Sequence, residues 1–311
     1  MRIVFIGSGQ LACPMLKALL DNAADSVVAV VTQPDRPSGR RLHLTPCPVK
    51  DFVAGRELNI MAVENASTSD VVEKFRAFSP DLMVVVDFGQ FLKKNVLALP
   101  TKGAINVHPS LLPKYRGAAP IQCTVANGDT ETGVSVLYVT EKMDAGDVIL
   151  QETVSIHDED TALTLEPKLA EVGARLLIKA LDLIREDRVI RKPQDESQVT
   201  FAHKLKKEDG RIDWPQPAAV IRNRIRGYVP WPGCFCEVPD GSGHMLRIVK
   251  ARVEPVCRVP GMVLELSGDG PLVACGENAL RLLEVQPEGK KPMSGAAYLC
   301  GHKLKIGELL G

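Results

Sequence analysis

Short apolar runs alternate with helical patterns through the first part of the chain, and this alternation constrains the fold more than any other feature. Each run has the length of a buried strand, and segments with apolar residues at helical spacing lie between them. The runs are Arg2–Gly7, Ser26–Thr32, Ile60–Ala62, Asp81–Val86 and Ala104–Val107. Strands that alternate with helices favour an α/β fold with a doubly wound, mostly parallel, Rossmann-like sheet.

The last part of the chain has a different pattern. From Cys234 onward, short apolar runs are interrupted by Pro and Gly, which predicts a smaller C-terminal antiparallel β-barrel domain. A length of 311 residues is enough for two domains, each with its own core. We expect these domains at residues 1–186 and 208–311, with a polar linker at residues 187–207.

Composition limits the class of protein. The chain is 45% hydrophobic and 24% charged, as a globular protein is, and no apolar run is long enough to cross a bilayer, so we expect a cytoplasmic location. Its eight cysteines form no Cys-x-x-Cys pair, which argues against a zinc site. Residues 201–311 carry 16 basic against 12 acidic side chains, whereas residues 1–200 carry 22 against 26. This asymmetry hints at a polyanionic partner for the C-terminal part.

An amide and an imidazole stand together at the end of one predicted strand. Asn106 and His108 are two positions apart, so at strand period they point to the same side. A histidine there is more often structural than catalytic, but Asp144 follows a second apolar strand, in a turn that contains Gly146. Chemistry in open α/β sheets collects outside strand ends. We therefore expect Asn106, His108 and Asp144 to converge on a site suited to acyl transfer, with Asn106 donating to an oxyanion.

Two other classes of function also fit parts of the sequence. The turn from Gly7 to Ala12 has the form G-x-G-x-x-A that binds dinucleotides, which would suit a nicotinamide dehydrogenase. The second strand lacks the expected acidic end and finishes in Thr32-Gln33-Pro34, which weakens that interpretation. A non-catalytic RNA-binding protein would explain the basic stretches, but it would leave the amide, imidazole and carboxylate without a role.

Four segments together resemble the signature of enzymes that use 10-formyltetrahydrofolate. They are Asn106-x-His108, Ser110-Leu111-Leu112-Pro113, Tyr115-Arg116-Gly117 and Asp144-Ala145-Gly146-Asp147. The chain is most similar to the branch of this formyltransferase family whose acceptor is methionyl initiator tRNA. The resemblance implies that residues 1–186 are the catalytic domain and that residues 208–311 bind tRNA. The reaction that the resemblance implies requires neither a metal nor a nucleotide, and we expect the protein to be a monomer.

The resemblance also implies roles for single residues. Asn106, His108 and Asp144 would be catalytic, and Asp144 would hold the imidazole and favour its cation. The loop formed by Ser110, Leu111, Leu112 and Pro113 would lie against the folate. The triad does not identify the attacking amine, so sugar-nucleotide formyltransferases stay as the nearest alternative. The chain departs from the family at Ser8-Gly9-Gln10-Leu11 and at Asp87-Phe88, and we assign Asp87 no role.

Two basic stretches are candidates for RNA contact. Residues 33–46 are predicted to be a long loop, and its arginines resemble those of the family loop that meets the acceptor end of tRNA. Lysines at the entry to the second domain would contact the phosphate backbone of the RNA. The candidates are Arg36, Arg40, Arg41, Lys204, Lys206 and Lys207. A long amphipathic helix is also predicted over residues 161–184, with its firm start near Pro167.

Overall fold

The helices and strands group into two units. The computed structural model describes residues 1–38, 43–239, 243–256, 258–301 and 304–311. Unit 1 comprises Met1–Pro120, Glu131–Ser155 and Glu166–Ala202, and unit 2 comprises Ile121–Thr130, Ile156–Leu165 and His203–Gly311. No helix among the described residues is both long and apolar enough to cross a membrane.

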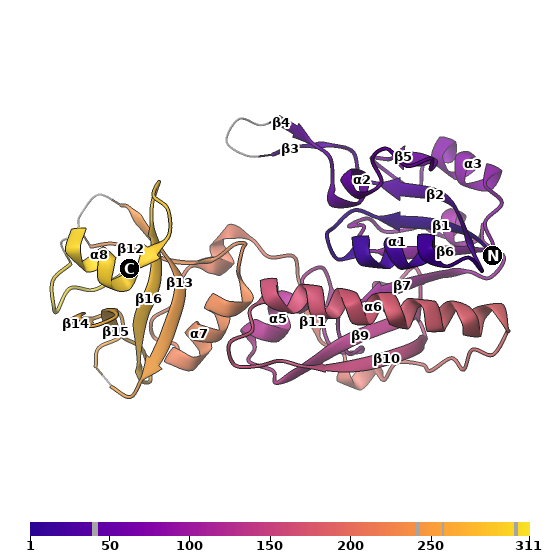
Figure 1. Ribbon diagram of the computed structural model, residues 1–311. Coiled ribbons are helices and arrows are strands. Elements are labelled where there is room, and N and C mark those ends of the chain that lie inside the picture. Colours follow the sequence, from indigo (N-terminus) through magenta and orange to yellow (C-terminus); the bar gives the residue numbers. More distant parts are fainter. Residues whose placement is uncertain (39–42, 240–242, 257, 302–303) are drawn as a thin grey trace. The chain divides into compact units, whose positions relative to one another are not determined.

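Unit 1 is built on a sheet with the strand order β10-β9-β7-β6-β1-β2-β5 (Figure 1). The strands from β7 to β5 pair in parallel, and β9 and β10 join antiparallel at one edge. The strands are β1 (Arg2–Gly7), β2 (Ser26–Thr32), β5 (Ile60–Ala62), β6 (Leu82–Val86), β7 (Ala104–His108), β9 (Glu131–Tyr138) and β10 (Val148–Ser155). The helices are α1 (Ala12–Asp21), α2 (Pro48–Phe52), α3 (Ser69–Ala77), α4 (Lys94–Leu97) and the main part of α6 (Ala162–Arg185).

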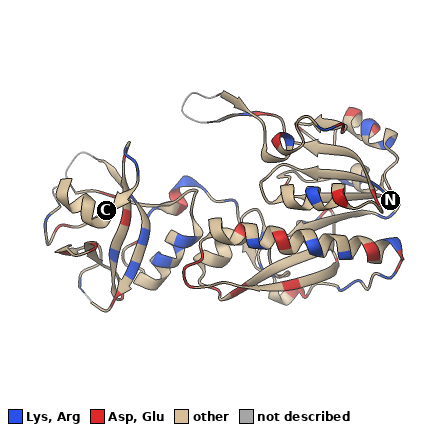
Figure 2. Ribbon diagram, in the orientation of Figure 1, with Lys and Arg blue, Asp and Glu red and all other residues tan. Residues whose placement is uncertain are grey.

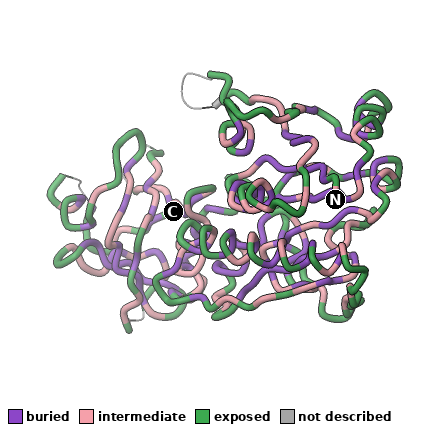
Figure 3. Tube along the Cα trace, turned by 45° about the vertical axis from the view of Figure 1, so that its right-hand side comes forward, coloured by how far each residue is buried: buried purple, intermediate pink, exposed green. Residues whose placement is uncertain are grey.

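The apolar runs are strands because the sheet is covered on both faces. On one face, Ile6 of β1 packs with Phe75 of α3 and Val96 of α4. On the other, Gly173 of α6 approaches Met15 of α1 so closely that a larger residue would overlap it. Strands covered in this way carry apolar residues at nearly every position, and Figure 3 shows them buried. The predicted doubly wound, mostly parallel sheet is confirmed.

Within residues 33–46, where we predicted a loop without regular structure, the described residues include two short strands. Strands β3 (Arg36–Ser38) and β4 (His43–Thr45) pair antiparallel, and Figure 1 shows them projecting from the rest of unit 1. Pro37 stands opposite Leu44 in this pairing. The composition of this segment did not predict the two short strands, because strands at an edge tolerate Pro and exposed polar residues.

Helix α6 begins earlier than predicted. Its first residue is Ala162, and Pro167 lies inside the helix. Thr161 and Thr164 cap the start reciprocally, since each backbone N–H donates to the hydroxyl of the other, at 2.9 and 3.2 Å. These two bonds satisfy amide groups that would otherwise be unpaired at the helix start. The helix therefore has a capped start five residues before Pro167, which the proline alone did not reveal.

Unit 2 contains the antiparallel sheet β12-β13-β16-β15-β14, to which β17 adds beside β16. The strands are β12 (Cys234–Glu237), β13 (Met245–Glu254), β14 (Val263–Ser267), β15 (Gly270–Ala274), β16 (Ala279–Pro287) and β17 (Met293–Ser294). Three helices, α5 (Pro120–Ala126), α7 (Ala218–Gly227) and α8 (Gly295–Gly301), and the 3₁₀ turn η2 (Lys207–Gly210) complete the described elements outside the sheet.

The final segment connects the two edges of this sheet. Glu237 at the end of β12 exchanges backbone hydrogen bonds with Gly311, at 2.8 and 3.0 Å. At the other edge, Val263 of β14 donates to Glu308 and accepts from Gly307, both at 2.8 Å. The segment thus supplies partners to both edge strands, as a barrel requires. The predicted antiparallel barrel is consistent with this closure.

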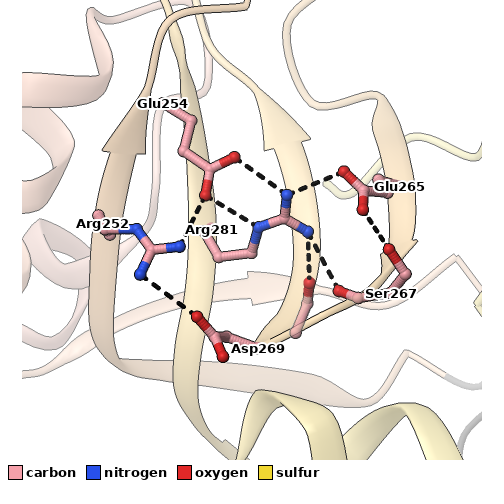
Figure 4. Close-up of polar contacts among 7 residues, drawn as sticks. Arg252, Glu254, Glu265, Ser267, Asp269 and Arg281 are labelled. Atoms are coloured by element: carbon pink, nitrogen blue, oxygen red, sulfur yellow. Dashed lines mark hydrogen bonds and ion pairs between the residues drawn. The ribbon is translucent and has the colours of Figure 1, made fainter.

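A buried arginine braces the sheet of unit 2 (Figure 4). Arg281 of β16 is 7% exposed, and all five of its N–H groups have acceptors. It donates to both carboxylate oxygens of Glu254 at 3.1 and 3.0 Å, and to Glu265 at 2.8 Å. It also donates to the carbonyls of Ser267 and Gly270, at 3.2 and 3.0 Å, which closes the turn between β14 and β15. One side chain of β16 is therefore bonded to three other strands, β13, β14 and β15.

Replacing Arg281 by Met keeps most of the volume but removes every one of these donors. We expect the free energy of unfolding to fall by roughly 2 to 4 kcal/mol, because carbonyls and a carboxylate lose their partners inside the fold. Urea unfolding of the full chain measures this loss. Arg252→Met is the matched control, since Arg252 pairs with Glu254 and Asp269 but is 54% exposed, and it should change little. Equal losses in the two variants would contradict the bracing role.

Stability should also depend on pH through Glu254. Hydrogen bonds from Arg281 hold the pKa of Glu254 below its ordinary value, so the folded protein binds this proton more weakly than the unfolded chain. The stabilisation is complete above the unfolded pKa of about 4.3 and is lost as the pH falls toward the lower folded value. Glu254→Gln should therefore be less stable than the wild type at neutral pH, with the difference narrowing below about pH 4. A constant difference across a pH series of urea unfolding curves would count against this account.

Candidate active site

The structure brings an amide, an imidazole and a carboxylate together at the end of β7. Asn106 and His108 lie on the same side of this strand, and Asp144 lies in the turn that follows β9. Asn106 Nδ2 donates to Asp144 Oδ1 at 3.1 Å, and His108 Nδ1 lies 3.7 Å from Asp144 Oδ2. The side chains of His108 and Asp144 are 5% and 14% exposed, so the charges act in a partly desolvated setting.

The orientation of the Asn106 amide follows from chemistry. A carboxylate only accepts hydrogen bonds, so the NH₂ group, and not the carbonyl, must face Asp144. That group has two hydrogens, and Asp144 takes one of them. No described residue takes the second, so it is available to an oxygen of a bound substrate.

The same reasoning fixes the His108 ring. Its Nε2 lies 2.9 Å from the backbone carbonyl oxygen of Tyr115, which can only accept, so Nε2 carries a hydrogen. In the neutral ring, Nδ1 is then the nitrogen with the free electron pair, and it is the one beside Asp144. The distance of 3.7 Å is too long for a hydrogen bond, but it is short enough for the carboxylate to stabilise a proton on Nδ1.

The turn that carries Asp144 is held at several points. Asp144 has a φ of 49°, an unusual conformation for a residue with a side chain, and its Oδ2 accepts the backbone N–H of Gly117 at 2.9 Å. Gln194 Nε2 donates to the carbonyls of Asp144 and Gly146, at 2.7 and 2.8 Å. Arg116 in turn donates to Gln194 Oε1 at 3.0 and 2.8 Å, which orients the amide. This chain of bonds fixes the carboxylate in front of His108.

Gly117 is required at its position. Its φ is 129°, and a Cβ there would overlap the carbonyl oxygen of Ala202. The close approach arises because β8 (Arg116–Gly117) pairs in parallel with β11 (Phe201–Ala202). The pairing presents the Gly117 N–H to Asp144. The segment that pairs with β8 lies 85 residues further along the chain and therefore helps to build the site.

The loop after β7 is anchored through buried polar groups. Ser135 Oγ donates to the carbonyl of Ser110 at 2.6 Å and accepts the N–H of Leu112 at 3.1 Å. The Ser110 hydroxyl donates to the carbonyl of Lys114 at 2.7 Å, and Ser110 and Leu112 are both buried. Leu111 and Pro113 are half-buried. A ligand beside this loop would therefore meet Leu111, Pro113 or the backbone, while Ser110 and Leu112 keep the loop in place.

The glycine-containing turn after β1 is covered by a carboxylate. The backbone N–H groups of Ser8 and Gly9 donate to the carbonyl of Asp87 at 3.1 and 3.2 Å. Its side chain lies so close to Gly9 that a Cβ there would overlap Oδ2. Asp87 is partly open to solvent, yet surrounding protein raises the pKa of its carboxyl. The carboxyl group of Asp87 occupies the space at Gly9 where a pyrophosphate would approach, which argues against the dinucleotide interpretation.

The candidate RNA-contact residues are placed as follows. Arg36 of β3 is exposed and pairs with Glu64 at 2.8 Å. Lys204, Lys206 and Lys207 of unit 2 are exposed, and none pairs with a carboxylate in the described part of the chain. Arg40 and Arg41 lie outside the described residues.

Comparison with known proteins identifies the class. The model of the formyl transferase family matches residues 1–181, and that of the formyl transferase C-terminal domain matches residues 204–303. The chain belongs to the formyltransferase family. A methionyl-tRNA formyltransferase from Moorella thermoacetica is 44% identical over 313 residues, covering 100% of this chain and 99% of that protein. One from Trichlorobacter lovleyi is 40% identical over 309 residues, covering 99% and 96%.

A solved structure shares the fold at low identity. WlaRD, a sugar 3N-formyl transferase solved in the presence of dTDP and 5-N-formyl-THF, has a TM-score of 0.66 at 17% identity. The match covers 94% of this chain and 99% of that one. It supports the fold of the whole chain, and the sequence relatives carry the family assignment.

Gln194 offers a test of how the Asp144 turn is held. Gln194→Glu keeps an acceptor for Arg116 but loses the N–H donors that bind the carbonyls of Asp144 and Gly146. We expect turnover to fall about tenfold or more, because a small displacement of a catalytic group is costly, with little change in the melting temperature. Steady-state kinetics and thermal unfolding measure both. Gln198→Glu is the control, since the bonds of Gln198 to described residues all lie within its own exposed turn. Wild-type turnover of Gln194→Glu would refute the role.

Proposed function

We propose that this chain transfers the formyl group of 10-formyltetrahydrofolate to the α-amino group of methionyl initiator tRNA. The product is N-formylmethionyl-tRNA, which serves translation initiation. The observation that carries the proposal is the position of Asp144, which takes one amide hydrogen of Asn106 and lies beside Nδ1 of His108. Because Nε2 is bonded to the carbonyl of Tyr115, the second amide hydrogen and Nδ1 are left for reacting groups. The relatives at 40% and 44% identity, matched over almost their whole length, support the choice of acceptor.

The reaction joins the amine nitrogen to the formyl carbon. As this bond forms, the formyl oxygen gains negative charge, and the second Nδ2–H of Asn106 donates to it. His108 Nδ1 takes the proton that the amine loses, and Asp144 stabilises the resulting imidazolium. The bond from carbon to N10 of the folate then breaks, and His108 returns the proton to N10. Tetrahydrofolate leaves with the proton, and the formyl group remains on the amine.

The other assignments complete the proposal. Residues 1–186 form the catalytic domain, residues 187–207 a linker, and residues 208–311 the tRNA-binding barrel. Ser110, Leu111, Leu112 and Pro113 form the loop beside the folate, and the half-buried Leu111 and Pro113 are the side chains that would contact it. The tRNA contacts are Arg36, Arg40, Arg41, Lys204, Lys206 and Lys207. The enzyme acts as a monomer in the cytoplasm.

The acceptor is tested by competition. The wild-type protein is incubated with 10-formyltetrahydrofolate and an equimolar mixture of methionyl initiator tRNA, methionyl elongator tRNA and an amino-sugar nucleotide, and the products are separated by mass. We expect the formyl group on the initiator tRNA alone. Formylation of the sugar in place of the tRNA would assign the chain to the other acceptor class.

The catalytic assignment is tested by single substitutions. Asn106→Ala and His108→Ala should each lower kcat by on the order of a hundredfold, since each removes a group that acts in the transition state. Asp144→Asn should also lower kcat, because the imidazolium loses its counter-charge. Thermal unfolding of each variant checks that the fold is kept. Near-normal turnover in folded His108→Ala protein would end the proposed role of the imidazole.

A further inference from the structure

The turn after α7 leaves one tryptophan open to solvent. Trp231 is 53% exposed, whereas the other tryptophan of the chain, Trp214, is 4% exposed. Its indole has no hydrogen-bond partner among the residues that the structure describes. A single exposed apolar side chain is ordinary on a protein surface, so the significance of Trp231 depends on what surrounds it.

An arginine lies directly against this turn. Arg247 of β13 donates to the carbonyl of Pro230, which immediately precedes Trp231. Gly233 has a φ of 74°, and a Cβ there would overlap the guanidinium of Arg247. The N–H of Gly233 also donates to the carbonyl of Tyr228 at 2.8 Å, which joins the turn to the end of α7. The loop that carries Trp231 is therefore held in one place beside a cation.

Further cations lie near this turn. Arg224 is in the last turn of α7, and its backbone carbonyl accepts the N–H of Tyr228, where the Trp231 turn begins, at 2.9 Å. The turn η2 packs on the same loop, since a Cβ at Gly210 would overlap the carbonyl oxygen of Gly233. That contact brings the basic start of η2, with Lys206 and Lys207, to this side of unit 2. Figure 2 shows Lys and Arg along α7 and β13.

These cations are mostly not neutralised within the protein. Arg224, Arg247, Lys206 and Lys207 form no ion pair with any carboxylate in the described ranges. The turn η2 also carries Glu208 and Asp209, whose charges balance those of Lys206 and Lys207. The net positive charge beside Trp231 therefore comes from Arg224 and Arg247, which an anion can use.

Unpaired cations alone would suit any polyanion, but the open indole narrows the choice. Proteins that hold single-stranded nucleic acid combine a basic surface for phosphates with an aromatic ring on which a base stacks. A base inside a duplex is already stacked and offers no free face to such a ring. We propose that Trp231 is a stacking platform for an unpaired nucleotide of the RNA substrate, with Arg247 and Arg224 meeting its phosphates. This inference rests on the proposed function, because it takes the substrate to be a tRNA.

Kinetics of three variants test the platform. Trp231→Ala should raise the KM for methionyl initiator tRNA about tenfold, as expected for the loss of one base-stacking contact. Both kcat at saturating tRNA and the KM for 10-formyltetrahydrofolate should stay unchanged. Trp231→Phe keeps an aromatic ring and should recover most of the affinity. Ile306→Ala is the matched control, because Ile306 of unit 2 is 67% exposed and is not one of the residues that the proposal assigns to RNA contact.

Fluorescence gives a direct readout that does not depend on catalysis. Titration with a short single-stranded RNA should quench the wild-type emission, a duplex of the same length should quench it much less, and Trp231→Phe should show no quenching by either. Unchanged KM in folded Trp231→Ala together with equal quenching in Trp231→Phe would overturn the inference. Failure of the proposed function looks different, since the wild-type protein would then formylate no tRNA.

Discussion

The desolvated carboxylate of Asp144 is the constraint on which the site depends. A partly buried charge needs partners, and Asp144 has the Asn106 amide at 3.1 Å, the Gly117 N–H at 2.9 Å and the His108 ring at 3.7 Å. Asn106 and His108 come from the end of β7 and Gly117 from the short strand β8, while Asp144 itself lies in the turn after β9. The requirement to satisfy one carboxylate thus fixes three segments relative to one another, and the groups left over face the substrate.

Sequence patterns predicted the parts of this arrangement that follow from periodicity. The strand period placed Asn106 and His108 on one side of β7, and the rule that chemistry collects at strand ends pointed to Asp144. Gln194 was not predicted, because it bonds to backbone carbonyls, which every residue has, and it lay in a stretch without apolar pattern. The protonated nitrogen of His108 was not predictable either, because it depends on the carbonyl of Tyr115, seven residues further along the chain.

In unit 2 as well, the local sequence pattern predicted the strands, whereas a polar contact between distant residues was not predicted. Short apolar runs separated by Pro and Gly predicted the antiparallel strands, and these runs contain the buried residues of β13 and β16. Arg281 has no such signal, because a charged residue inside a strand normally indicates an exposed face. Its burial depends on Glu254 and Glu265 from two other strands, which supply the carboxylates that let a guanidinium stay out of water. Long-range partners of this kind cannot be inferred from one stretch of sequence.

The bond from His108 Nε2 to Tyr115 has a geometric consequence for the proposed reaction. Because Nε2 is bonded to the main chain, Nδ1 alone must accept the proton from the attacking amine and later donate it to the departing nitrogen. The attacking and departing nitrogens therefore have to lie on the same side of the imidazole, within reach of Nδ1 in turn. Acceptor and donor must approach the histidine from one direction, and an acceptor too bulky to share that approach would be excluded by shape alone.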